Sequence, residues 1–90
     1  MTVGEFRNIL EQEKITSVTW QGDNVFQGLK LIEGYLNPLE WNLITAAEHD
    51  IIYSVEVEML INAGITEPDI KQLGRLNWMV WEDACLACFV

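Results

Sequence analysis

The strongest hydrophobic pattern of the chain lies at its C-terminal end. Two apolar runs, Trp78 to Trp81 and Cys85 to Val90, flank the acidic pair Glu82 and Asp83. Short β-prone runs separated by a polar dipeptide predict a β-hairpin. Both runs are apolar at almost every position, which predicts that both faces of this hairpin are covered. Because an isolated hairpin is only marginally stable in water, the other segments must supply that cover.

Two helices are predicted in the first half of the chain. A Thr-x-x-Glu capping box opens the first, over about Val3 to Lys14, where apolar residues follow one stripe. The second is predicted over Val25 to Leu36, where apolar residues recur at helical spacing and Asp23 or Asn24 can cap the first turn. Between them, Ile15 to Trp20 alternates β-branched with small polar residues, which predicts a short strand.

Two shorter helices are predicted in the second half. Ser54 is placed to cap the first, and Gly64 to end it in the left-handed conformation. Thr66 followed by Glu-Pro-Asp opens the second, because a threonine cap, an early proline and an acidic first turn are typical of helix starts. Gly74 or Asn77 ends this helix just before the C-terminal hairpin.

The segment from Leu39 to Tyr53 has two interpretations. The favoured one is a pair of strands, Asn42 to Ala47 and Ile51 to Ser54, with Glu48-His49-Asp50 as a bend or bulge between them. The alternative is one continuous helix, since Asn37-Pro38 also makes an acceptable helix start. With these elements the sequence predicts an α+β fold: a small, mostly antiparallel sheet that includes the C-terminal hairpin, packed by three to four short helices.

Composition predicts one compact acidic domain over residues 1–90. Half of the chain is apolar, which is enough to build a core and argues against disorder. No apolar run approaches the roughly 20 residues that span a bilayer, and the start of the chain lacks the pattern of a secretory signal. We therefore expect a cytoplasmic protein that does not insert into membranes.

The charge of the chain is strongly negative and unevenly placed. Fourteen Asp and Glu against five Lys and Arg give a net charge of −9, and eight acids but no bases lie between Leu31 and Ile70. Such a field opposes phosphates, so we expect no direct binding to nucleic acid. It attracts a partner with a basic surface. The alternative explanation for the charge is solubility alone.

Few residues offer catalytic or metal-binding chemistry. Glu48-His49-Asp50 is the one His-carboxylate cluster, and it forms an acid/base pair only if the chain bends there. Cys85 and Cys88 have CxxC spacing, but in a strand this spacing sends the two thiols to opposite faces. A zinc site needs two further ligands, and His49 is the single histidine. We expect reduced, buried cysteines, no cofactor, no metal and no catalytic residue.

Three stretches carry a resemblance to a known group of proteins. They are Ala46 to Tyr53 (Ala-Ala-Glu-His-Asp-Ile-Ile-Tyr), Thr66 to Ile70 (Thr-Glu-Pro-Asp-Ile), and Trp81 to Val90. Together they resemble small uncharacterised proteins of phages and mobile elements. The likeness covers the C-terminal half, contains no motif diagnostic of an activity, and departs from the group at Cys85-Leu86, where an aromatic residue is expected. It implies a fold and a genomic neighbourhood in which small acidic proteins often inhibit host defence.

These observations favour a non-enzymatic protein-binding module, of the kind a phage uses to inhibit a host defence protein, that presents an acidic face to a basic partner. The alternative is a small-ligand-binding protein or minor enzyme with a pocket around His49. The sequence leaves the oligomeric state open. The predicted partner-binding residues are Glu33, Glu40, Trp41, Glu48, His49, Asp50, Glu56 and Glu58.

Overall fold

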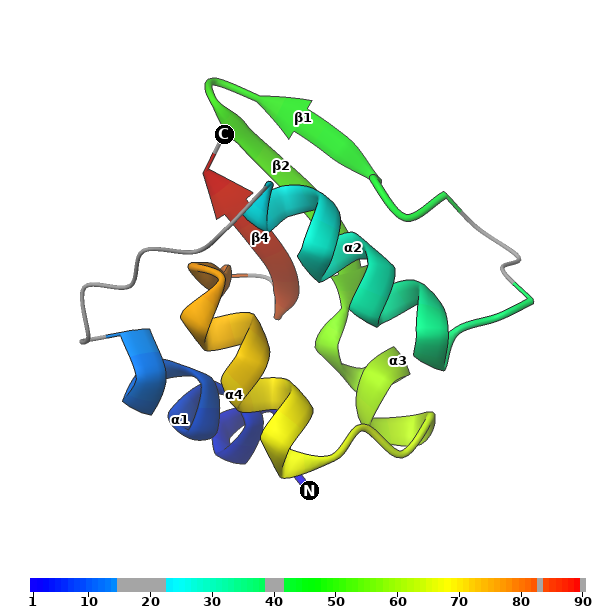
Figure 1. Ribbon diagram of the computed structural model, residues 1–90, viewed down its shortest axis with the longest axis vertical. Helices are drawn as coiled ribbons and strands as arrows, with labels where there is room; N and C mark the ends of the chain where they lie inside the picture. Colours follow the sequence, from blue (N-terminus) through cyan, green and yellow to red (C-terminus); the bar gives the residue numbers. More distant parts are fainter. Residues whose placement is uncertain (15–22, 39–41, 83, 90) are drawn as a thin grey trace.

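The computed structural model describes residues 1–14, 23–38, 42–82 and 84–89, which form four helices and one four-stranded antiparallel sheet (Figure 1). The predicted α+β class is therefore confirmed. The predicted strand over Ile15 to Trp20, and the predicted site residues Glu40 and Trp41, lie outside the described residues. The elements in chain order are α1 (Val3–Lys14), α2 (Asn24–Tyr35), β1 (Ala46–Glu48), β2 (Ile51–Glu56), α3 (Val57–Asn62), α4 (Glu67–Arg75), β3 (Trp78–Val80) and β4 (Cys85–Phe89).

The C-terminal hairpin holds the sheet together. The strand order is β1-β2-β4-β3, so β4 pairs with β3 on one side and with β2 on the other. Leu86, Ala87 and Cys88 are consecutive residues of β4, and all three are fully buried. Successive residues of a strand point to opposite faces. The prediction that both faces are covered therefore holds for the middle of this strand but not for its end, where Phe89 is 51% exposed.

The segment before α3 forms a second hairpin, so the favoured interpretation of two strands is confirmed and the continuous helix is wrong. The first strand is shorter than predicted, because β1 begins at Ala46 rather than Asn42. Glu48 belongs to β1 and pairs with Ile51. The connection is only two residues long, His49 and Asp50, and both have positive φ (48° and 60°). Two consecutive residues with positive φ are typical of a type I′ turn, a common two-residue connection in β-hairpins.

Ser54 does not cap a helix, contrary to prediction. It lies within β2, is 2% exposed, and donates a hydrogen bond from its hydroxyl to the Leu43 carbonyl oxygen (2.6 Å). Pairing of β2 with β4 continues as far as Glu56 and Cys85, past an irregularity after Tyr53. Long-range pairing thus extends the strand beyond the local cap signal, and α3 begins only at Val57.

The other helix boundaries follow their local signals, except that Thr66 stands at the N-cap position of α4 without making the side-chain cap hydrogen bond that its residue type predicted. Asp23 caps α2 by accepting hydrogen bonds from the amides of Val25 and Phe26. Thr2 and Glu5 form the reciprocal hydrogen bonds of a capping box at α1 (3.0 and 3.1 Å). The Thr2 backbone amide, and then its hydroxyl, hold the pKa of Glu5 below its usual value. Past α3 and α4 the chain turns at residues with positive φ, Gly64 (84°) and Asn77 (66°), as predicted.

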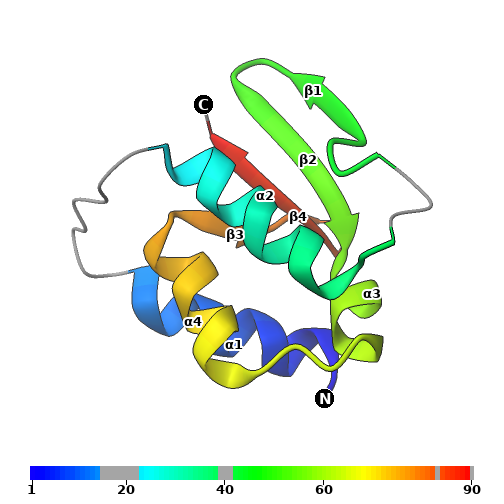
Figure 2. The ribbon, with the colours of Figure 1, turned by 45° about the vertical axis from the view of Figure 1, so that its right-hand side comes forward.

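The helices pack against one face of the sheet and along its β3 edge (Figure 2). Paired residues share a face, so the register places Ile52, Cys88 and Trp78 side by side on the same face. The Trp78 indole is fully buried there and donates to the Asn24 carbonyl oxygen (3.2 Å) at the start of α2. Gly28 lets α2 come this close, because a Cβ at this position would lie 2.0 Å from Trp78 Nε1.

Candidate functional site

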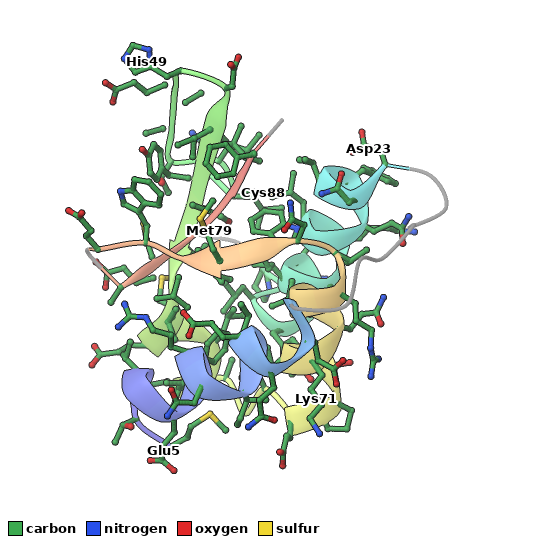
Figure 3. The ribbon with its side chains drawn as sticks, turned by 90° about the vertical axis from the view of Figure 1, so that its left-hand side faces the viewer. Glu5, Asp23, His49, Lys71, Met79 and Cys88 are labelled. Atoms are coloured by element: carbon green, nitrogen blue, oxygen red, sulfur yellow. The ribbon has the colours of Figure 1, made fainter. Side chains whose placement is uncertain are left out.

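The opposite face of the sheet is not covered by a helix among the described residues. The register pairs Ile51 with Phe89, and it pairs Ala87 with both Tyr53 and Met79. In Figure 3 the hairpin of β1 and β2 rises above α1 and α4, with α2 on one side of it and no described helix on the other. We call this surface the helix-free face; its residues are Ile51, Tyr53, Met79, Ala87 and Phe89, together with Trp81 beside Tyr53.

The helix-free face is apolar and aromatic. Phe89 is 51% exposed, and Ile51, Tyr53, Met79 and Trp81 are half-buried without belonging to the described hydrophobic core. The Tyr53 and Trp81 rings meet edge to face, with centroids 6.0 Å apart and planes at 74°. This arrangement is favourable for aromatic pairs and fixes both rings at the surface. Adjoining exposed apolar side chains of this kind mark interaction sites more often than isolated ones do.

Carboxylates border this face at both ends. Glu48 pairs with Ile51 and so points to the same side, while Glu82 directly follows Trp81 at the far end. Asp50 stands in the turn next to Ile51. The sequence from 46 to 56 and from 78 to 89 contains no Lys or Arg, and all five bases lie in the segments 3–14, 24–35 and 67–75, which form the three longer helices. The described strands and turns of the sheet therefore contribute carboxylates, and no Lys or Arg, to the border of this apolar surface.

The structure separates the predicted site residues into three groups. Glu48, His49 and Asp50 stand at the exposed tip of the first hairpin, whereas Glu33 lies on α2, beyond the covered face. Glu56 and Glu58 lie where β2 passes into α3, and both are exposed. From the tip to Glu56, β2 runs for six residues, Ile51–Glu56, a span of roughly 17 Å between its two ends. Thus Glu48 and Asp50 border the helix-free face near its tip, and the unpredicted Glu82 lies next to Trp81, while Glu56 pairs with Cys85 at the other end of β2.

His49 lies in open solvent at the tip of the first hairpin. Its side chain is 89% exposed, and its Nε2 lies 3.5 Å from Oε1 of the neighbouring Glu48. A general acid or base works in a site that positions the substrate and limits access of water, and the described residues leave most of the His49 side chain open to water. A hollow of about 440 Å³ lies at the other end of β2, and His49 does not line it.

The two cysteines differ in burial. Cys88 is fully buried on the helix-covered face, while Cys85 is half-buried. Their spacing along β4 directs the two side chains to opposite faces, as the sequence predicts. Within the described ranges, no three His, Cys, Asp or Glu side chains come together in an arrangement that would hold a metal ion.

Comparison with known proteins adds no relative, since no family model, curated protein or solved structure matches this chain. None of the helices among the described residues combines the length and apolarity needed to cross a bilayer. Sequence reasoning missed the helix-free face. The signal available in the sequence was the spacing of apolar residues two positions apart, Ile51 and Tyr53 in one strand and Ala87 and Phe89 in another. Residues two apart in a strand lie on the same face of the sheet.

Proposed function

We propose that this chain is a non-enzymatic protein-binding module that docks through its helix-free face. The observation that carries the proposal is one surface: an exposed phenylalanine among half-buried aromatic and aliphatic side chains, with carboxylates at both ends and no base in the strands beneath. Aromatic side chains dominate the energetics of protein interfaces, and a charged border sets which partner approaches. The complementary partner presents apolar side chains surrounded by Lys and Arg.

The resemblance of the C-terminal half to small proteins of phages and mobile elements supports a narrower proposal. In that setting the module is an inhibitor that acts in the cytoplasm on a host defence protein. Defence proteins that handle nucleic acid carry basic surfaces, because they must neutralise phosphates. A small domain of net charge −9 with an apolar centre is suited to occupy such a surface.

The test is to capture a partner with the wild-type chain and then to compare how tightly matched charge variants bind it. The wild-type chain, immobilised, is exposed to a bacterial host lysate, and the captured protein is identified, purified and titrated at about 0.1 M and then at higher salt. Glu48→Gln with Glu82→Gln removes two carboxylates beside the helix-free face. Glu11→Gln with Glu33→Gln removes two exposed carboxylates from α1 and α2, with the same change in net charge.

The first pair should weaken binding roughly threefold to tenfold and reduce its salt dependence, while the control pair should stay near wild type. Equal losses in both pairs would show that the charge acts only as a general field. Binding that is indifferent to salt and to both pairs would contradict the proposed docking surface.

A further inference from the structure

A hollow of about 440 Å³ adjoins the helix-free face where β2 passes into α3. Cys85 and Glu56 both line it, and they pair across β4 and β2. Cys85 lies two residues before Ala87 on the same strand, so it points to the same side of the sheet as Ala87 and Phe89. The hollow is therefore a continuation of the surface that we propose as the docking surface.

Most polar groups of the hollow are already used within the fold. The Ser54 hydroxyl donates to the Leu43 carbonyl oxygen, and the Thr45 hydroxyl lies within 3.3 Å of the carbonyl oxygens of Tyr53 and Ser54. Two groups remain for an incoming ligand: the Glu56 carboxylate and the Asn42 carboxamide, both on exposed residues. The structure gives Glu56 no ion pair and no capping hydrogen bond among the described residues.

The remaining walls are apolar. Val55 is 3% exposed and forms a rigid part of the lining, while Met59 on α3 and Cys85 are half-buried. Such walls favour an aliphatic stem, and the methionine side chain adapts readily to its shape. The volume falls within the range of about 300–1,000 Å³ that is typical of ligand pockets. The hollow thus combines apolar walls for a stem with a carboxylate and an amide for a cationic head.

We infer that this hollow binds an arginine side chain of the partner protein, an inference that rests on the proposed function. Arginine fits better than lysine because its planar guanidinium carries five donors, enough to reach both carboxylate oxygens of Glu56 and the Asn42 amide oxygen. Lysine carries a compact, strongly hydrated ammonium and loses more hydration on entry. The apolar walls of Val55 and Met59 hold the methylene stem in either case.

The experiment uses N-acetyl-arginine methylamide as a probe, with N-acetyl-lysine methylamide as its counterpart, titrated into the ¹⁵N-labelled full chain and followed by NMR. The arginine probe should shift the amide signals of Thr45, Glu56 and Met59 in a saturable way, and should bind at least about threefold more tightly than the lysine probe. Glu56→Gln should weaken the arginine probe roughly threefold to tenfold, whereas Glu33→Gln should leave it unchanged.

Absence of saturable shifts, equal binding of the two probes, or an unchanged Glu56→Gln variant would each overturn the arginine assignment. The Glu56→Gln chain should remain folded, because this exposed side chain makes no capping hydrogen bond, and its spectrum reports the fold directly. If the probe fails while the captured partner still binds through the helix-free face, only the arginine site is wrong. If the probe binds as expected but no partner depends on that face, the proposed function falls and the site stands.

Discussion

The two faces of the sheet are formed by the same strands but differ in how far their side chains are buried. On the covered face, Trp78, Leu86 and Cys88 are fully buried, and α2 approaches closely enough to require glycine at position 28. On the helix-free face, Phe89 is half exposed and Tyr53 packs against Trp81 outside the described core. One strand, β4, supplies residues to both faces in alternation.

Charged residues are also distributed differently between the helices and the strands. On the helices, Lys71 Nζ lies 3.9 Å from Glu67 Oε1, and Arg75 Nη2 lies 3.4 Å from Glu13 Oε1. These two acids therefore have basic neighbours. The strands carry acids without bases. The covered face therefore contains most of the buried side chains, whereas the helix-free face carries partly exposed apolar area and negative charge, which we propose as the contact surface for a partner. This contrast predicts that substitutions on the two faces affect different measurements.

The largest effect should come from ending the chain at residue 83, which removes β4 and with it both faces at once. Both pairings of the sheet centre are lost, along with Leu86 and Cys88. A buried leucine alone contributes about 1.5–3 kcal/mol, against a total stability of about 5–15 kcal/mol. The shortened chain should show no cooperative unfolding by circular dichroism; a cooperative transition would contradict the central role of β4.

The neighbours Trp78 and Met79 separate the faces most directly. Trp78→Ala removes a fully buried indole from the covered face and should lower the free energy of unfolding by about 3–5 kcal/mol. Met79→Ala acts on the helix-free face, where the side chain is only half-buried, and should cost about 1 kcal/mol or less. Urea unfolding of both variants checks this. Equal losses would mean that the two faces are equally important for stability.

Two glycines of α2 offer a finer test. Gly28→Ala forces a Cβ against the Trp78 indole and should destabilise by about 1–3 kcal/mol, although alanine is the better helix former. Gly34→Ala meets nothing within 4 Å and should stabilise by roughly 0.5–1 kcal/mol. The difference in sign isolates the close approach of α2 from general helix propensity. A Gly28→Ala chain as stable as the wild type in urea would contradict that close contact.

Features with local causes were predictable from the sequence. The Asp23 cap, the Thr2 capping box, and the turns at Gly64 and Asn77 depend on residues within a few positions of each other. Ser54 was predicted wrongly because its cap signal is also local, while pairing of β2 with the distant β4 decided the outcome. The strand-rich C-terminal hairpin was recognisable from its apolar runs alone.

The candidate site was predictable only in part, for the same physical reason. Acidic residues between Leu31 and Ile70 are visible in the sequence, but their distribution over the surface depends on the fold. The helix-free face arises where Ile51 pairs with Phe89, and no local pattern fixes a register between such distant residues. The acidic border was therefore foreseen at Glu48 and Asp50, and the apolar surface that it borders was not.

The most direct test of the docking surface compares two exposed phenylalanines. Phe89 on the helix-free face is 51% exposed, and Phe26 on α2 is 58% exposed, so Phe89→Ser and Phe26→Ser remove similar apolar groups from opposite sides. Binding of the captured partner is measured for both, with urea unfolding as the control for the fold. The proposal predicts at least a tenfold loss, about 1.4 kcal/mol, for Phe89→Ser and no change for Phe26→Ser. Unchanged binding by a folded Phe89→Ser chain, or an equal loss in both, would contradict it.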